Sequence, residues 1–225
     1  MSKTKVKFCG FTNTDDVKQA LDLDIDLIGL VFVESSPRYI KLKEAEAICK
    51  LCEKKIKTVG VFMNNSEEFI TKVIDRTNID LLQFHGQESL EMCVNFNKPY
   101  IKTVHVDDKP LGDGINLYEN HPLQPNFFSY LLDTKTKHIQ GGTGMQFNWD
   151  SIIDYKKNLH LQDNHIFIAG GLDSSNIKKL ILDYNPFGID VSSGIEFSKG
   201  KKSPSLMKKF IENVRIADSE KSKKK

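Results

Sequence analysis

The sequence predicts an α/β fold made of one single-domain (β/α)8 TIM barrel, and three observations support that prediction. A short apolar run followed by a polar loop occurs eight times in the 225 residues. A segment with the apolar spacing of a helix follows nearly every run, and such alternation is typical of a parallel sheet. Each unit spans roughly 25 to 30 residues, and eight units are the number that closes such a barrel. An open, doubly wound sheet is the structural alternative, which eight such short units disfavour.

The predicted strands are the eight apolar runs. They span Lys5–Cys9, Asp26–Val33, Lys57–Phe62, Asp80–His85, Tyr100–Val106, Phe128–Asp133, Ile166–Ala169 and Phe187–Val191. The second run is apolar almost throughout, as expected for a parallel strand that is covered on both faces.

The predicted helices follow the strands. They span Thr14–Asp22, Leu42–Glu53, Ser66–Arg76, Glu88–Phe96, Ser151–Asn158, Ser174–Asp183 and Pro204–Val214. Ser66 and Ser174 are typical helix caps, and Ser203 followed by proline is a typical helix start. The fifth unit differs, because the segment Asp107–Phe127 contains several Pro and Gly residues and has no clean helical period. We expect an irregular connection there, with one short helix around Asn116–Asn120.

Composition indicates an ordinary globular chain. Apolar residues make up 39%, and 32 basic residues nearly balance 30 acidic ones, for a formal net charge of +2. We therefore expect no nucleic-acid partner. Residues 1–217 are predicted to form the barrel, and residues 218–225 a basic, disordered C-terminal tail.

Targeting and cysteine patterns indicate a cytoplasmic protein. The sequence contains neither a signal peptide nor an apolar run long enough to span a membrane. Its four cysteines have no framework spacing, which favours a reducing compartment. Cys49 and Cys52 form a C-x-x-C inside a charged helical segment, and we interpret them as ordinary helix residues rather than a redox pair.

Glycine and serine residues collect where the last strands end. Gly170-Gly171 follows the seventh strand and Ser192-Ser193-Gly194 the eighth, and Gly142 and Gly144 lie beyond the sixth. Loops at these places commonly bind phosphate through backbone N–H groups, which glycine leaves accessible. A single such loop would be interpreted as a turn, but three in succession predict a phosphate site.

Two chemically reactive side chains end strands on opposite sides of the predicted mouth. Cys9 ends the first strand and Asp133 the sixth, so a thiolate could remove a proton from a sugar carbon while a carboxylic acid protonates the ring oxygen. A free thiol has a pKa near 8.5 and would need a lower one to act near neutrality. By strand parity Lys7 faces the interior like Cys9. Asp190 lies on the eighth strand, which is next to the first strand in a closed barrel. We therefore predict an ion pair between Lys7 and Asp190 beneath Cys9, and we expect the Lys7 cation to favour the Cys9 thiolate.

Two further side chains are candidates for substrate binding. Arg38 follows Pro37 in a rigid, extended segment, and its guanidinium suits a carboxylate; a surface arginine is the alternative. His85 ends the fourth strand, where a structural imidazole is equally compatible with the sequence. For Asp133 the alternative is a cap of the following loop.

Motifs in a fixed order carry a resemblance to the phosphoribosylanthranilate isomerase family of tryptophan biosynthesis. The motifs are Lys7-Phe8-Cys9-Gly10-Phe11-Thr12, Ser36-Pro37-Arg38, Gln83-Phe84-His85-Gly86, Leu131-Leu132-Asp133, Gly141-Gly142-Thr143-Gly144, Ala169-Gly170-Gly171-Leu172 and Asp190 to Glu196. The resemblance extends from about Lys5 to Val214. The chain departs from the family pattern at Asn148, where Asn can cap a helix as well as the usual Asp. It also departs across Ser198–Ser203, which leaves the start of the last helix open.

The resemblance implies an Amadori rearrangement of N-(5′-phosphoribosyl)anthranilate without metal or cofactor. It assigns the general base to Cys9, the general acid to Asp133 and the contact with the anthranilate carboxylate to Arg38, while the late Gly and Ser loops hold the phosphate. The expected partner is a phosphorylated small molecule, and the expected assembly a monomer or homodimer.

Two rival functions remain at this point. Another phosphate-sugar barrel enzyme is the first. A histidine-pathway isomerase, however, would require a carboxylate where Cys9 stands. An epimerase would require several His and Asp metal ligands around the rim, where only His85 is well placed. A barrel that binds a phosphate sugar without turnover is the second. Activity on the anthranilate substrate distinguishes them.

Overall fold

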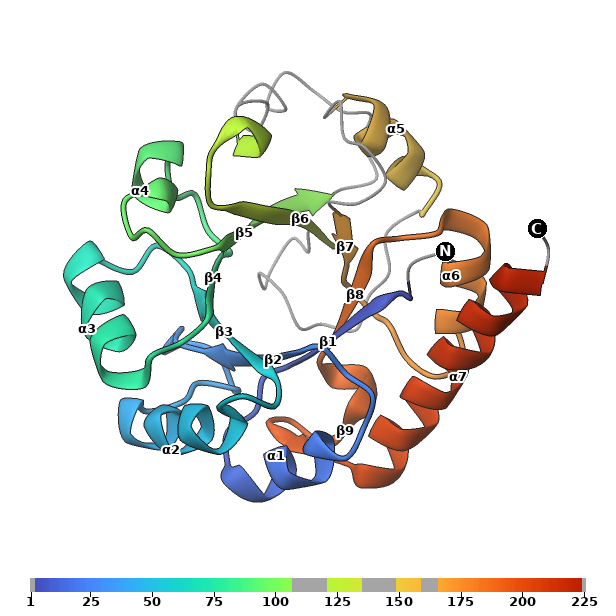
Figure 1. Ribbon diagram of the computed structural model, residues 1–225, viewed down its shortest axis with the longest axis horizontal. Helices are drawn as coiled ribbons and strands as arrows, with labels where there is room; N and C mark the ends of the chain where they lie inside the picture. Colours follow the sequence, from blue (N-terminus) through green and yellow to red (C-terminus); the bar gives the residue numbers. More distant parts are fainter. Residues whose placement is uncertain (1–2, 107–120, 135–148, 159–165, 224–225) are drawn as a thin grey trace.

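The chain forms a closed barrel of eight parallel strands, as the sequence predicts (Figure 1). The computed structural model describes residues 3–106, 121–134, 149–158 and 166–223. The strands are β1 Lys5–Cys9, β2 Leu27–Val31, β3 Lys57–Phe62, β4 Leu81–Phe84, β5 Tyr100–Val106, β6 Phe127–Thr134, β7 Ile166–Ile168 and β8 Gly188–Val191. They follow one another around the barrel in chain order, and β8 pairs with β1 to close it.

Helices surround the barrel on its outside (Figure 1). Those in the described residues are α1 Thr14–Leu21, α2 Leu42–Cys52, α3 Glu67–Thr77, α4 Leu90–Val94, α5 Ser151–Asn158, α6 Ile177–Tyr184 and α7 Pro204–Lys223. Between β5 and β6 lies a short 3-10 helix, η2 His121–Leu123. The short helix that we expected around Asn116–Asn120 lies outside the described residues.

Alternation along the strands separates two cores. Outward-facing residues such as Phe8 and Ile28 belong to the large core between barrel and helices. Inward-facing residues such as Leu27, Val59 and Leu131 fill the lower part of the barrel interior. Because successive strand residues point to opposite faces, Lys7 and Cys9 point inward between these apolar positions.

Two helices begin where the sequence predicts, each at a serine whose side chain accepts a hydrogen bond from a backbone N–H group. Ser66 Oγ accepts from Phe69 N at the start of α3, and Ser203 Oγ accepts from Leu206 N at the start of α7. The predicted cap at Ser174 is wrong, since α6 begins at Ile177. In its place Asp173 forms a tight turn by accepting from the two residues that follow Ser174.

The C-terminal segment differs from the predicted disordered tail, because α7 continues to Lys223. Contacts distant in sequence stabilise this extension. Asp218 accepts from the backbone N–H and the hydroxyl of Thr4, and Glu220 pairs with Lys178 of α6. A charged composition therefore did not prevent ordering, since these charges have partners on neighbouring elements.

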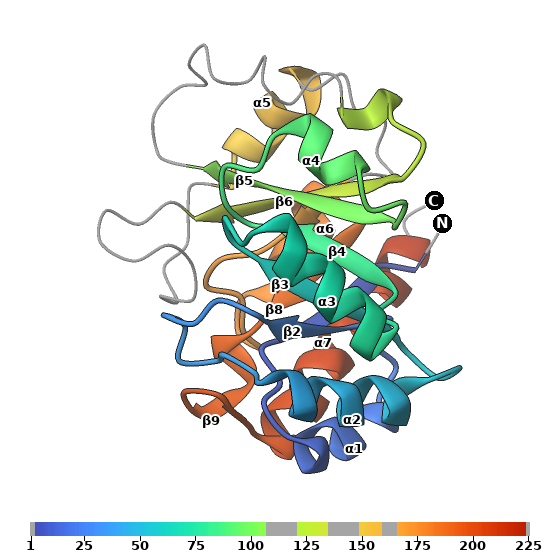
Figure 2. The ribbon, with the colours of Figure 1, turned by 90° about the vertical axis from the view of Figure 1, so that its left-hand side faces the viewer.

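A two-stranded hairpin, which no sequence pattern predicted, lies between β8 and α7. Its strands are β9 Glu196–Ser198 and β10 Lys201–Lys202, which pair antiparallel. Gly200 makes the turn at a φ of +77°, and its carbonyl accepts from the Thr12 hydroxyl in the β1–α1 loop. The hairpin lies at the end of the barrel opposite to the two chain termini (Figure 2).

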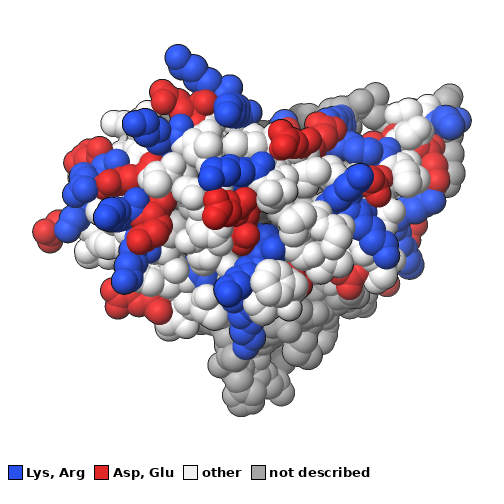
Figure 3. Space-filling model, turned by 90° about the horizontal axis from the view of Figure 1, so that it is seen from below, with Lys and Arg blue, Asp and Glu red and all other residues white. Residues whose placement is uncertain are grey.

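The face of the molecule in Figure 3 carries no patch of a single charge sign. On the face in Figure 3, basic and acidic side chains are interspersed. Among the helices within the described residues, none has the length and apolar character that crossing a membrane requires.

Candidate active site

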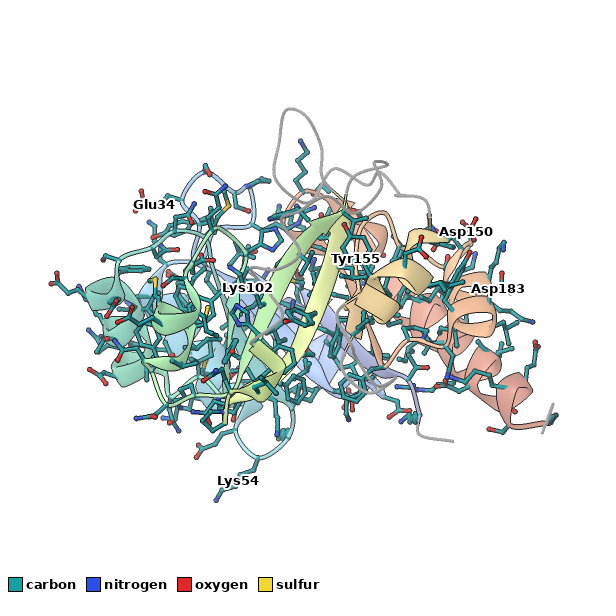
Figure 4. All side chains as sticks on the ribbon, turned by 90° about the horizontal axis from the view of Figure 1, so that it is seen from above. Glu34, Lys54, Lys102, Asp150, Tyr155 and Asp183 are labelled. Carbon is teal, nitrogen blue, oxygen red and sulfur yellow. The ribbon has the colours of Figure 1, made fainter. Side chains whose placement is uncertain are left out.

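The interior at the carboxyl ends of the strands is polar, in contrast to the apolar layers below it. Glu34, which follows β2, and Lys54, which follows α2, mark opposite ends of the barrel (Figure 4). In barrel enzymes the chemistry occurs at the end where the strands finish. Cys9, Asp133 and His85 all lie there, at the ends of β1, β6 and β4.

Cys9 is held in a space that only glycine leaves open. Its thiol is largely buried, with 8% of the residue exposed. It lies beside Gly29 of β2, where a Cβ atom would approach the sulfur to 2.6 Å. Any larger residue at position 29 would displace the sulfur, because real Cβ contacts are longer than this.

The predicted ion pair beneath Cys9 is confirmed. Lys7 Nζ lies 3.0 Å from Asp190 Oδ1, and the Lys7 side chain is fully buried. The two residues are direct neighbours in the register of β1 and β8. Burial lowers the pKa of Lys7, but Asp190 and Cys9 raise it by more, so the net shift is upward. The ammonium group is therefore charged at neutral pH.

The pKa of Cys9 is raised, because burial outweighs the cations around it. Lys7 and Lys202 lower this pKa, as the sequence analysis expected of Lys7, whereas Asp190 raises it. Lys7 thus favours the thiolate without making it the dominant form. In this geometry the group at rest is a thiol.

His85 and Asp133 lie side by side at the mouth. His85 Nε2 is 3.6 Å from Asp133 Oδ2. Burial, together with His105, Lys7 and Lys102, lowers the pKa of His85 to about 3, so the ring is neutral. Gln83 Nε2 lies 3.3 Å from His85 Nδ1 and can only donate. Thr103 Oγ1 lies 3.2 Å from the same ring nitrogen, and Nε2 is the nitrogen that faces Asp133.

Arg38 belongs to a buried charge cluster that the sequence analysis did not anticipate. Arg38 Nε and Nη2 donate to the two carboxylate oxygens of Glu196 at 2.8 and 2.7 Å. Lys202 Nζ donates to the same carboxylate at 2.8 Å. The guanidinium is therefore not a surface group: it lies between the β2–α2 loop and the hairpin. The signal that could have revealed Glu196 is its position beside Ser192–Gly194, within the family-like motif.

The loops after β7 and β8 pack directly on each other. A Cβ atom on Gly194 would lie 2.0 Å from the carbonyl oxygen of Leu172, so only glycine permits this contact. Gly170 and Gly171 adopt φ values of +86° and +63°. Ser192 Oγ donates to the Cys9 carbonyl at 3.0 Å, and Ser193 starts the short helix η3 Ser193–Ile195. These loops thus adjoin the thiol.

The third predicted phosphate loop falls on residues that the structure does not describe. Gly142 and Gly144 lie outside the described residues. Within the described ranges, no group of three or more His, Cys, Asp or Glu side chains is arranged to hold a metal ion.

Cys49 and Cys52 behave as the sequence analysis proposed for helix residues. Both lie in α2 and are free and buried. Burial raises their pKa values to about 11 and 12, which keeps the thiols protonated. A charged hollow beside Cys49, lined by Lys57, Asp80 and neighbouring residues, lies at the starts of the strands and thus away from the catalytic end.

A thiol and a carboxyl group at the mouth of a (β/α)8 barrel, with glycine loops after its last strands, define a class: barrel enzymes that isomerise phosphorylated sugars. Residues 6–213 match the family model of N-(5′-phosphoribosyl)anthranilate (PRA) isomerase. The chain belongs to this family.

Individual relatives agree with the family model. The chain is 35% identical over 217 residues to N-(5′-phosphoribosyl)anthranilate isomerase of Xanthomonas euvesicatoria pv. vesicatoria, covering 96% of this chain and 95% of the relative. It is 36% identical to the enzyme of that name from Legionella pneumophila (strain Lens), covering 95% and 98%. Phosphoribosyl anthranilate isomerase of Thermotoga maritima superposes with a TM-score of 0.80 at 31% identity, covering 95% and 99%.

A further solved isomerase contains reduced 1-(o-carboxyphenylamino)-1-deoxyribulose 5-phosphate. It superposes with a TM-score of 0.77 at 30% identity, covering 95% of this chain and 99% of that one.

Proposed function

We propose that this chain converts N-(5′-phosphoribosyl)anthranilate to 1-(2-carboxyphenylamino)-1-deoxyribulose 5-phosphate, with Asp133 as general acid and Cys9 as general base. The observation that carries the proposal is the placement of these two groups at the ends of β6 and β1, in a chain whose residues 6–213 match the isomerase family. Metal and cofactor have no part in the proposal.

The first step opens the sugar ring. Protonated Asp133 gives its proton to the ring oxygen, the C1′–O bond breaks, and the lone pair of the anthranilate nitrogen forms a C=N bond, which leaves an iminium cation on the sugar and a carboxylate on Asp133. In the proposed step the proton of the neutral His85 ring is on Nε2, so this N–H faces the carboxylate left on Asp133; Asp133 Oδ2 lies 3.6 Å from His85 Nε2. That N–H stabilises the anion as it forms, because a fixed donor in a buried site needs no reorganisation.

The second step moves a proton from carbon. Cys9, a thiol at rest, first gives its proton to solvent. The thiolate then removes the C2′ proton, and the electrons flow to the iminium nitrogen and give a neutral enolamine. The enolamine takes up a proton at C1′ and releases the proton of its 2′-hydroxyl group to solvent, which gives the aminoketose. Lys7 and Lys202 favour the thiolate, and each acid or base of this kind contributes on the order of 10²–10⁴-fold.

Substrate binding divides between the two sides of the mouth. Arg38 provides the cation for the anthranilate carboxylate, and Gly170, Gly171, Ser192, Ser193 and Gly194 form the phosphate site. The close contact of Gly194 with the Leu172 carbonyl and the left-handed Gly170-Gly171 pair support a site built from backbone N–H groups. His85 completes the lining beside Asp133.

Assembly and location follow the family. A solved structure shows monomers generated from the dimeric enzyme of Thermotoga maritima. For this chain the proposal comprises a monomer or a homodimer in the cytoplasm, with no nucleic-acid or membrane partner. Analytical ultracentrifugation decides between the two assemblies.

The test is turnover of freshly prepared phosphoribosylanthranilate, followed by loss of its anthranilate fluorescence. In ²H₂O the product of the proposed route carries one deuterium at C1′, detected by mass spectrometry. A barrel that only binds phosphate sugars would be stabilised against heat by the reduced product analogue and yet give no turnover, which would refute the proposal.

A further inference from the structure

Glu196 is a buried carboxylate with a position in the site but no role in the reaction described above. Its side chain is 4% exposed, and those of its partners Arg38 and Lys202 are 8% and 0% exposed. Breaking such a pair leaves an uncompensated charge in a poorly solvated place. The hairpin β9–β10 brings Glu196 and Lys202 to this place, since Glu196 pairs with Lys202 across its two strands.

The contact with Glu196 fixes the orientation of the Arg38 guanidinium. Nε and Nη2 both donate to the carboxylate, and a planar guanidinium held through two parallel bonds cannot rotate about either. On the opposite side, a Cβ atom on Gly10 would lie 2.5 Å from Arg38 Cδ, so the stem runs directly over the Gly10 backbone. No residue that the structure describes accepts from Nη1, which is left for a ligand.

Lys202 determines the charge that a ligand meets. Glu196 alone would neutralise Arg38, and an anionic ligand would gain little from the pair. Lys202 Nζ donates to Glu196 and also to the Ser192 carbonyl. Burial lowers the pKa of Lys202, and Glu196 acts against this shift; with Lys202 as an ammonium ion, the three side chains carry one net positive charge. The cluster therefore attracts one carboxylate, and it lies near Cys9, whose charge state it influences.

We propose that Glu196 is a specificity-positioning residue: it holds Arg38 so that Nη1 meets the carboxylate on the aromatic ring, while Lys202 keeps the cluster cationic. This inference rests on the proposed function. Glu196 and Lys202, which lie on the hairpin β9–β10 and not on the barrel strands, would thus take part in recognition of the anthranilate carboxylate.

The experiment compares two ligands that differ only in that group. The first is reduced 1-(o-carboxyphenylamino)-1-deoxyribulose 5-phosphate, and the second is the same compound without the carboxylate. Titration calorimetry gives the Kd of each for the wild type, Glu196→Gln and Lys202→Met. Ser198→Ala, an exposed position on the same strand β9, is the control.

A positioning role predicts a selective loss. Glu196→Gln should raise the Kd of the carboxylated ligand about tenfold to a hundredfold, which is the effect of losing a hydrogen bond to a charged group. It should change the Kd of the ligand without the carboxylate by less than about threefold. Lys202→Met should also reduce the preference for the carboxylated ligand over the ligand without the carboxylate, because the net charge of the cluster falls to zero. Ser198→Ala should leave both unchanged.

Equal losses for the two ligands would show that Glu196 only maintains the fold and would overturn the inference, as would unchanged affinities. If Glu196→Gln does not fold, the affinity ratio of Lys202→Met decides, since an effect on the phosphate loops cancels in that ratio. Wild-type turnover is measured separately. An active wild type with an unchanged ratio refutes the inference alone, whereas an inactive wild type refutes the proposed function.

Discussion

Replacing Lys7 by Met tests the ion pair under Cys9. The change keeps the length of the side chain and removes its charge, which leaves the Asp190 carboxylate, 9% exposed, without its cation. Removing one partner of a buried pair typically costs about 3–5 kcal/mol. We expect the free energy of unfolding to fall by about that amount, measured by urea denaturation at pH 7.

The same variant should raise the pKa of Cys9 further. Lys7 acts against the effect of burial on this thiol, and Asp190 acts with it. The rate of Cys9 carbamidomethylation as a function of pH, followed by mass spectrometry of the Cys9 peptide, measures this pKa separately from the three other cysteines.

The double variant Lys7→Met/Asp190→Leu is the matched control. It removes both charges, so it should recover most of the lost stability. Its Cys9 pKa should lie between those of the wild type and the single variant, because the lysine affects this thiol more than the aspartate does. An unchanged pKa in Lys7→Met would refute the interpretation that Lys7 favours the thiolate.

Two further predictions concern geometry and pH. Gly29→Ala should displace the Cys9 sulfur, because the new methyl group would lie 2.6 Å from it. We expect kcat to fall by ~10²-fold, the cost of misplacing a catalytic group by about 1 Å. The control is Gly60→Ala, which crowds the outer core instead and should lower Tm and not kcat. The pKa values of His85 and His121 are lowered to about 3 and 4, mainly by burial, so the unfolded chain binds more protons below pH 6.5. The free energy of unfolding should therefore fall between pH 6.5 and 5, with a slope approaching about 1.4 kcal/mol per pH unit for each histidine. Urea unfolding at pH 7, 6 and 5 checks this, and a flat profile would contradict the neutral assignment.

Local patterns in the sequence were sufficient to predict the barrel and one buried contact, the ion pair between Lys7 and Asp190. The eight strands follow from apolar runs, and their order follows from the closure of eight units. The Lys7–Asp190 pair was predictable because strand parity fixes the direction of both side chains and closure makes β1 and β8 neighbours.

Long-range polar contacts were not predictable in the same way. The bidentate contact of Arg38 with Glu196 joins residues 158 positions apart, and no local pattern encodes it. The helix α7 extends beyond Val214 because Asp218 and Glu220 find partners on other elements. Sequence composition alone described that segment as a disordered tail, since it shows charges and not their partners.

The direction of the Cys9 pKa shift could not be predicted from the sequence either. The sequence places Lys7 close to the thiol, which suggests a lowered pKa. Only the structure shows that the sulfur is enclosed beside Gly29 and that burial outweighs the nearby cations.

The most direct test of the central claim compares the wild type with Cys9→Ser and Asp133→Asn. The measurements are kcat for phosphoribosylanthranilate and the Kd of the reduced product analogue. We expect kcat to fall by 10²-fold or more in each variant, while each Kd stays within about threefold because neither change removes an anion-binding group. Turnover that persists in either variant would contradict the assignment of these two side chains as base and acid.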